Sequence, residues 1–222
     1  MDWVTTIRKE AQTSSILRRD ELARKYDIGP PSVTQALSRL ERKGFVEHVN
    51  DKTYYNSLAP DASPRDLVNV LRGDACISLE SALRDYGIST QSPHTLTCVT
   101  TERPDEFRSR TITISYRSIS PRLYWGFVRK TTRYGSYLIA EPEKTILDWI
   151  YLGIRNGRAP ALDELDFTNV NRPKLLEYAR RFSSSVYQHV LPALVESLVV
   201  GAGAGRRSPD PTVASAPTVT TR

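Results

Sequence analysis

Cysteine, histidine and long apolar runs are scarce in this sequence, and each scarcity excludes a class of protein. The 222 residues include only two cysteines, Cys76 and Cys98, so we expect reduced thiols and no disulfide framework. The three histidines, His48, His94 and His189, are far apart and lack the spacing of metal ligands. The sequence therefore predicts no metal site and no cofactor.

The apolar residues are nowhere gathered into a run of the roughly 20 residues that a spanning helix needs, so we expect no membrane partner. The first residues also lack the basic stretch and apolar run of a secretory signal. A cytoplasmic location is the expectation that follows.

Motifs of the common enzyme classes are missing as well. The sequence has no phosphate-binding G-x-x-x-x-G-K-[ST] loop, no G-x-G-x-x-G fingerprint and no serine elbow. The run Glu141-Pro142-Glu143-Lys144 is only superficially similar to nuclease carboxylate–lysine motifs, because Pro142 occupies a position that requires a carboxylate. We therefore expect no catalytic residues and no enzymatic activity.

Positive charge is in excess, and it is concentrated in the middle of the chain. Lysine and arginine number 31 against 25 acidic residues, a net charge of +6 that favours a polyanionic partner. Residues 1–58 carry a net charge of only +2, whereas residues 103–133 carry eight basic and two acidic side chains.

Residues 1–58 are predicted to form a winged helix-turn-helix DNA-binding domain. Helices are expected near 3–12 and 19–26, followed by a break at 27–30, because Gly29 permits a positive φ and Pro30 cannot continue the hydrogen-bond ladder. A third helix begins near Pro31, buries an i, i+3, i+4, i+7 stripe and stops at Gly44. Alternating residues near 45–49 and 53–56 indicate a hairpin, the wing.

The outer face of the third helix carries the side chains expected to contact DNA. Glutamine and arginine can read base edges, while hydroxyls and lysine can bind phosphates. The predicted DNA-binding residues are Ser32, Thr34, Gln35, Ser38, Arg39, Arg42 and Lys43 on the helix, with Lys52 at the wing tip. Such a unit can also serve as a protein-interaction module with a solvated basic helix. The modest net charge of residues 1–58 predicts that one copy of the chain binds DNA weakly and that several copies bind operator DNA cooperatively. The sequence leaves the oligomeric state open.

The rest of the chain is predicted to complete an α+β fold. We expect a linker at 59–66, a mixed α/β domain at 67–200 and a disordered tail at 201–222, which is poor in large apolar residues. Strands are expected at 95–100, 111–119, 123–130 and 134–140. Helices are expected at 79–85, from Pro142, at 172–182 and at 184–200, the last with a kink or a break at Pro192. Ser78 is expected to cap the helix at 79–85. In the helix from Pro142, Glu141, Glu143 and Lys144 are expected in the first turn, and Asp148 is expected to make a buried polar contact.

The arginine-rich stretch between these helices has two interpretations. It is either a solvated strand face or a basic patch for DNA or for an acidic partner. The candidate residues are Arg103, Arg108, Arg110, Arg117 and Arg122. Alternation predicts that Arg117 points away from the core that Ile114 and Tyr116 enter.

Two segments of the second domain resemble a known family. SLESALRDYG at 78–87 and IAEPEKTILDWIYL at 139–152 are similar to segments of the AbiEi antitoxins and related regulators, and ISYRSI at 114–119 and YWGF at 124–127 match the family between them. The resemblance covers about residues 3–200, with Thr145 in place of the usual alanine.

Membership would imply an antitoxin of a bacterial type IV toxin–antitoxin system. Such a protein represses its own operon through the winged helix and antagonises a nucleotidyltransferase-like toxin, often without a stable complex. Two alternatives stay open. The chain could be a stand-alone winged-helix regulator whose second domain senses a ligand or oligomerises, or an enzyme that inactivates the toxin covalently.

Overall fold

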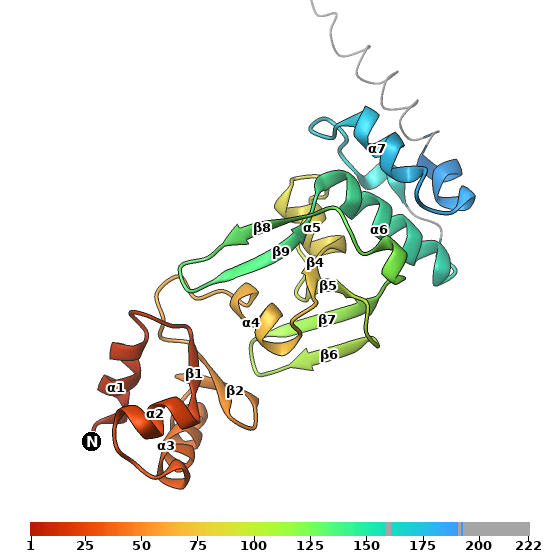
Figure 1. The fold of residues 1–222 in the computed structure, drawn as a ribbon. Coiled ribbons are helices and arrows are strands. Elements are labelled where there is room, and N and C mark those ends of the chain that lie inside the picture. The colour runs from red at the N-terminus through yellow and green to blue at the C-terminus, as the bar shows by residue number, and fades with distance from the viewer. Residues whose placement is uncertain (159–160, 191, 193–222) are drawn as a thin grey trace, which may run out of the picture.

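The computed structural model describes residues 1–158, 161–190 and 192 (Figure 1). It confirms the predicted α+β class, a winged helix-turn-helix followed by a sheet-containing domain. The predicted helix at 184–200 is helical over residues 184–190 and at Pro192, and residues 191 and 193–200 lie outside the described residues, so the expected kink or break is not tested. The predicted tail at 201–222 also lies outside them.

The winged helix consists of three helices and a three-stranded antiparallel sheet of order β1-β3-β2. Its elements are α1 (Trp3–Glu10), β1 (Ile16–Arg18), α2 (Arg19–Lys25), α3 (Pro30–Arg42), β2 (Val46–Asn50) and β3 (Thr53–Asn56). Val33, Leu37 and Leu40 of α3 are buried against Ile7 of α1 and Leu22 of α2. The apolar stripe therefore fixes which face of α3 is left outside.

The turn before α3 differs from the expectation. Gly29 has a φ of −59°, and the residue in the left-handed region is Asp27, with a φ of 52°. The break is completed by prolines in the first turn of α3, where the helix needs no backbone donor. Gly44 ends the helix with a φ of +75°, as its position predicts.

A six-stranded mixed sheet of order β6-β7-β5-β4-β9-β8 forms the centre of the second domain. Its strands are β4 (Cys76–Ile77), β5 (Leu96–Thr100), β6 (Asp105–Arg108), β7 (Thr113–Ser118), β8 (Phe127–Thr131) and β9 (Ser136–Ala140). The pairs β4–β9 and β5–β7 are parallel, and the other neighbours are antiparallel. The strand predicted at 123–130 begins only at Phe127, because Leu123 closes a 3₁₀ turn, η1 (Pro121–Leu123), and Gly126 has a φ of +74°.

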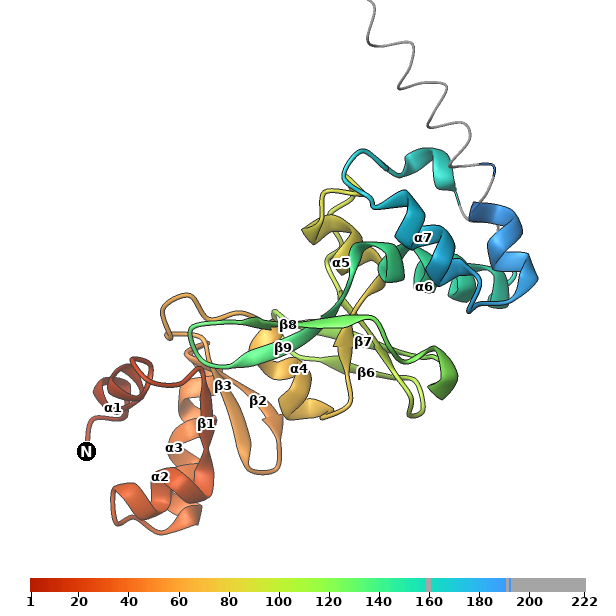
Figure 2. The ribbon, with the colours of Figure 1, turned by 45° about the horizontal axis from the view of Figure 1, so that its top comes forward.

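Helices cover both faces of this sheet (Figure 2). They are α4 (Arg65–Leu71), α5 (Leu79–Asp85), α6 (Pro142–Arg155) and α7 (Arg172–Ala179), with a 3₁₀ turn, η2 (Leu162–Glu164), before α7. Leu67 and Val68 of α4 pack on one face, among Ile77, Cys98 and Ile114. The opposite face, which includes Cys76, packs among residues of α5, η1 and α6. Both thiols are therefore buried on different sides of the sheet, and neither forms a disulfide.

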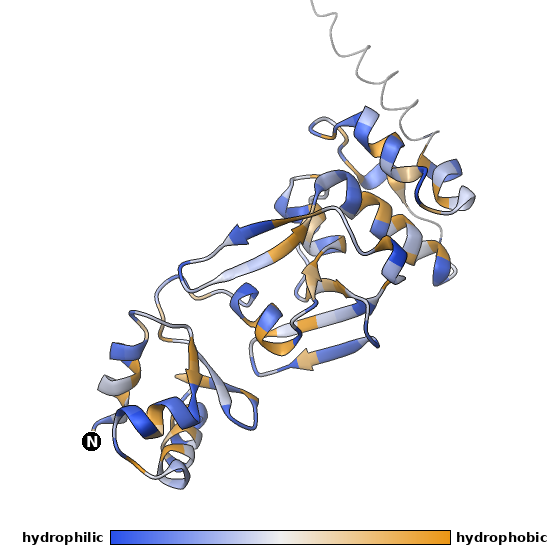
Figure 3. Ribbon diagram, in the orientation of Figure 1, coloured by the Kyte–Doolittle hydropathy of each residue, from blue (hydrophilic) through white to orange (hydrophobic). Residues whose placement is uncertain are grey.

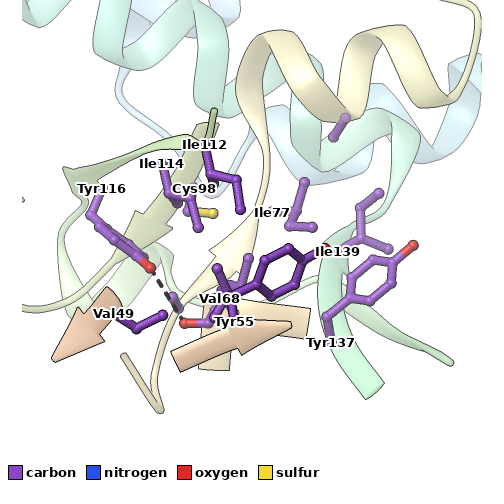
Figure 4. Packing of buried hydrophobic residues seen from close by; sticks show 13 residues of the cluster. Val49, Tyr55, Val68, Ile77, Cys98, Ile112, Ile114, Tyr116, Tyr137 and Ile139 are labelled. Carbon is purple, nitrogen blue, oxygen red and sulfur yellow. Dashed lines mark hydrogen bonds between the residues drawn. The ribbon is translucent and has the colours of Figure 1, made fainter. Parts of the chain in front are cut away.

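The wing packs directly on the second domain. Val49 of β2 and Tyr55 of β3 belong to the same buried cluster as Tyr116 and Ile139 of the sheet (Figure 4). The stretch expected to be a linker, 59–66, overlaps the start of α4 at Arg65. One face of the wing thus covers the winged-helix core, and the other face covers the sheet.

Polar contacts surround this apolar junction. The Glu47 carboxylate of β2 accepts hydrogen bonds from the hydroxyls of Ser109 and Thr111, in the turn between β6 and β7, and from the Thr111 amide at 3.3 Å. Tyr134 Oη donates to the carbonyl oxygen of Ala11 at 2.9 Å, and Ser15 Oγ donates to the Asp66 carboxylate of α4 at 2.9 Å. These contacts hold α3 in one orientation relative to the sheet.

Candidate nucleic-acid interface

The predicted DNA-binding face of α3 is open to solvent. Gln35, Arg39 and Arg42 are exposed, as are Ser32 and Lys43. Thr34 and Ser38 are half-buried, and Thr34 Oγ1 donates to the Pro30 carbonyl oxygen at 3.0 Å within the helix. The seven residues lie outside the buried stripe of α3, so the face that a major groove would meet is cationic and rich in hydrogen-bonding groups.

The one acidic side chain in the last turns of α3 belongs to Glu41. Glu41 Oε1 accepts a hydrogen bond from the backbone N–H of His48 in β2 at 3.3 Å, and the residue is half-buried. This contact joins the helix to the wing, and Glu41 forms no ion pair with Arg39 or Arg42 in the described part of the chain. The outer face therefore keeps its positive character.

The wing tip is tied to the start of α2. The Arg19 backbone N–H donates to the Lys52 carbonyl oxygen at 2.8 Å, and Lys52 Nζ lies 3.2 Å from the Asp20 carboxylate. Hydrogen bonds from Arg19 and Lys52 lower the pKa of Asp20, so this carboxylate is ionised at neutral pH. Lys52 is exposed as expected, but Asp20 offsets part of its charge.

A buried carboxylate fixes α1 against α2. Glu10 accepts hydrogen bonds from Lys25 Nζ at 2.8 Å and from Tyr26 Oη. Burial raises the pKa of Glu10, and these hydrogen bonds lower it by more, so the net shift is downward. The two helices that support α3 are therefore joined by a charged contact as well as by apolar packing.

One family model matches this part of the chain. Residues 2–53 are similar to the N-terminal DNA binding domain of iron dependent repressors. The chain thus carries a winged-helix domain similar to those of DNA-binding repressors, and this similarity supports DNA as its partner. No curated protein matches the chain at a significant level.

The matched family is named for iron. Among residues 1–158 and 161–190, no group of three or more histidine, cysteine, aspartate or glutamate side chains lies close enough to hold a metal ion. No helix in the same residues is long and apolar enough to cross a membrane.

The predicted basic patch is divided between the two ends of β6 and β7. Arg108 ends β6 and pairs with Glu106 at 2.6 Å, and Arg110 occupies the turn beside the winged helix. Arg103 precedes β6, Arg117 is near the end of β7, and Arg122 is in η1, all at the opposite end. All five are exposed, and Arg117 points away from the core as expected.

Arg110 is the member of the patch that reaches α3. A Cβ atom placed on Gly44 would lie 2.7 Å from Arg110 Nη2, so the guanidinium rests against the end of the helix. The hydrogen bonds of Glu47 hold the residues on either side of Arg110. The fold thus brings Arg110 to the end of α3 that carries Arg42 and Lys43, a juxtaposition that the sequence alone did not reveal.

The two segments that resemble the antitoxin family meet inside the second domain. Ser78 Oγ, just before α5, donates to Asp148 Oδ2 in α6 at 3.0 Å. Asp148 is fully buried, as expected. The Ser78 hydroxyl does not cap α5 as expected, because it is hydrogen-bonded to Asp148 in α6. Leu83 of α5 and Ile146 of α6 share one apolar cluster.

Lys144 is a buried charged residue whose burial the sequence did not reveal. It lies in the first turn of α6, yet it is fully buried and pairs with Asp148. Its Nζ lies 5.4 to 5.5 Å from the ring centroids of Trp125, Phe127 and Phe182. Burial lowers the pKa of Lys144 and raises the pKa of Asp148 to about 6, because desolvation penalises both charges more than their attraction compensates.

The two glutamates of the same turn hold α7 in place. Glu141 accepts hydrogen bonds from Tyr178 Oη at 2.7 Å and from Lys174 Nζ at 2.9 Å. Glu143 accepts from the backbone N–H of Asn171, at the start of α7, at 3.0 Å. Their role is thus wider than the expected interaction with the helix dipole of α6.

Proposed function

We propose that the chain is a transcription repressor that inserts α3 into the major groove of operator DNA. The observation that carries this proposal is the exposed cationic face of α3 in a domain similar to repressor DNA-binding domains. The net charge of +2 in residues 1–58 is small, so useful affinity requires several copies on one operator.

Binding of the upstream intergenic DNA tests the repressor proposal. Purified full-length chain is titrated onto that fragment and onto an unrelated fragment of equal length, at several salt concentrations. We expect tighter and cooperative binding of the intergenic fragment, weakening steeply as salt rises. Equal binding of the two fragments, or no binding in dilute buffer, would refute the proposal.

We also propose that the second domain antagonises a nucleotidyltransferase-like toxin encoded next to this chain, as the resemblance to AbiEi antitoxins implies. Support comes from the meeting of the two family-like segments at Ser78 and Asp148, since these two residues are 70 positions apart in the sequence and yet form a hydrogen bond. Stand-alone transcription regulation remains the alternative function, because both a regulator and an antitoxin would use the winged helix to bind DNA.

Co-expression separates these two functions. The neighbouring gene is induced alone and together with this chain, and growth is recorded. Growth rescue by the chain is the outcome expected of an antitoxin, and absence of toxicity or of rescue supports the stand-alone regulator. Mass spectrometry of the rescued toxin is the companion measurement. We expect an unmodified toxin, and a new covalent group on it would assign enzymatic activity to this chain.

A further inference from the structure

A second charged site lies at the end of the sheet remote from the winged helix. A cavity of about 720 Å³ opens between α5, the end of β7 and the last turns of α6. This volume falls within the range of roughly 300–1,000 Å³ that is usual for small-molecule sites. The cavity is separate from the α3 face, so it belongs to neither DNA contact described above.

The lining of this cavity includes three guanidinium groups and one carboxylate. Arg117 comes from β7, Arg155 ends α6 and Arg158 follows it, while Glu80 of α5 is the only acidic residue of the lining. None of the ion pairs found among residues 1–158 and 161–190 includes any of these three arginines. Clustered guanidiniums without carboxylate partners repel one another, and a bound phosphate would relieve that repulsion through bidentate hydrogen bonds.

The remaining wall offers an aromatic plane and amide groups. Trp149 is half-buried at the cavity, and Gln91 and Asn156 also line it. The Gln91 amide donates a hydrogen bond to the Glu164 carboxylate at 2.8 Å, and its carbonyl oxygen remains as an acceptor. An indole can stack on a planar base, and side-chain amides can hydrogen-bond to base edges. Phosphate-binding and ring-binding groups therefore occur in one cavity.

The cavity is held in shape by the buried network. Leu79, which lines it, has a φ of +59°, a conformation that costs a non-glycine residue free energy. The preceding residue, Ser78, is fixed from two sides, by its hydrogen bond to Asp148 and by Thr97 Oγ1, which donates to its carbonyl oxygen at 2.8 Å. Trp149 follows Asp148 directly. The two family-like segments thus build this wall together.

We propose that this cavity binds a nucleotide, with Arg117 and Arg155 on the phosphates and Trp149 on the base. Arg155 is already oriented toward β7, since its Nη1 donates to the Ser118 carbonyl oxygen at 3.4 Å. The inference goes beyond the proposed function, because it concerns a ligand site that neither operator binding nor toxin antagonism requires.

Isothermal titration calorimetry with the full-length chain tests the proposal in the absence of DNA and toxin. ATP, GTP, CTP and UTP are titrated separately, with inorganic triphosphate as the ligand that lacks a base. We expect saturable binding of at least one nucleotide, tighter than that of triphosphate. Arg117→Ser and Arg155→Ser should each weaken it by about tenfold, the loss typical of a hydrogen bond to a charged group.

Arg122→Ser supplies the matched control, because Arg122 is exposed but does not line the cavity. We expect it to leave nucleotide affinity unchanged, and circular dichroism to show equal melting temperatures for all three variants. The proposal is overturned if no nucleotide binds, if triphosphate binds as tightly as the nucleotides, or if the double variant of Arg117 and Arg155 binds like the wild type. A short single-stranded oligonucleotide that binds these arginines when free nucleotides do not would also overturn it.

Discussion

The ammonium group of Lys144 has no contact with solvent, and its only ionic partner in the described part of the chain is Asp148 in the same helix. Three aromatic rings surround it, and the Ser78 hydroxyl binds the other side of the carboxylate. A buried pair of this kind adds little net stability, because desolvation offsets the attraction, but either charge left alone is costly. The pair therefore specifies how α5, α6 and the sheet fit together.

Removing one partner tests this account. Asp148→Ala should lower the free energy of unfolding by about 3–5 kcal/mol, because it leaves the Lys144 charge buried without compensation. The double variant Lys144→Met, Asp148→Leu should be less destabilised than Asp148→Ala alone. Urea denaturation followed by circular dichroism measures both. Asp163→Ala is the control, since Asp163 is exposed and forms none of the ion pairs found in the described residues, and it should change little.

Part of this site could be predicted from the sequence. The apolar stripe beside Asp148 correctly predicted a buried polar contact, since a carboxylate next to such a stripe must be buried with a partner. Nothing local marks Lys144 as buried. Its cage is built by Trp125 and Phe127 from one segment and Phe182 from another, and only the tertiary fold brings these rings together.

At the scale of elements, the long periodic helices were predictable and the short strands were not. α3 and α6 carry repeated apolar residues over 13 and 14 residues, so their patterns stand out. β1 and β4 have three and two residues, too few to show alternation, and they exist because neighbouring strands pair with them. β6 has charged residues at three of its four positions, and it is an edge strand. By contrast, β9 lies between β4 and β8, and its apolar part is visible in Figure 3.

The division of the basic patch leads to a prediction about β6 and β7. Arg110 lies against the end of α3, whereas Arg117 and Arg122 lie at the far end of the same strands. Replacing Arg108, Arg110, Arg117 and Arg122 together with serine should reduce the salt dependence of operator binding, and we expect the reduction to come from Arg110. The slope of log K against log salt should fall by about 0.9 for each DNA phosphate that the protein no longer neutralises.

Single variants provide the comparison for this slope. Arg110→Ser should reproduce the change of the fourfold variant, and Arg122→Ser should have the wild-type slope. A slope that stays unchanged in the fourfold variant would show that the strands take no part in DNA binding. An equal change in both single variants would show that position relative to α3 does not matter.

At the scale of the whole molecule, Glu47 of the wing joins the winged helix and the sheet into one unit. Burial raises the pKa of this carboxyl, but the hydrogen bonds from Ser109 and Thr111, together with the charge of Arg110, lower it by more. A carboxyl whose folded-state pKa is lowered contributes stability above its ordinary pKa, and this contribution disappears as the pH falls through the folded-state value.

Glu47→Gln should therefore destabilise the chain in a pH-dependent way. At neutral pH we expect a decrease of about 1–3 kcal/mol in the free energy of unfolding, the usual cost of removing a hydrogen-bonded charge. The difference from the wild type should begin to shrink as the pH falls through the ordinary glutamate pKa of about 4.3, and it should become small once the pH is below the lowered folded-state pKa of Glu47. Urea denaturation at several pH values measures it, with the exposed Glu177→Gln as control. A difference that is constant with pH would contradict the assigned charge.

The junction between the wing and the sheet raises the question of whether DNA binding and the proposed toxin antagonism are separable. Arg39 is exposed on the outer face of α3 and takes part in none of the contacts between the wing and the sheet. Arg39→Ala should therefore abolish repression of a reporter driven by the upstream promoter, while growth rescue in co-expression with the toxin stays near the wild-type level. Arg8→Ala on α1, likewise exposed, should leave both readouts unchanged. If Arg39→Ala removed rescue and repression together while its melting temperature stayed that of the wild type, antagonism would depend on bound DNA, and the second domain would not act on the toxin by itself.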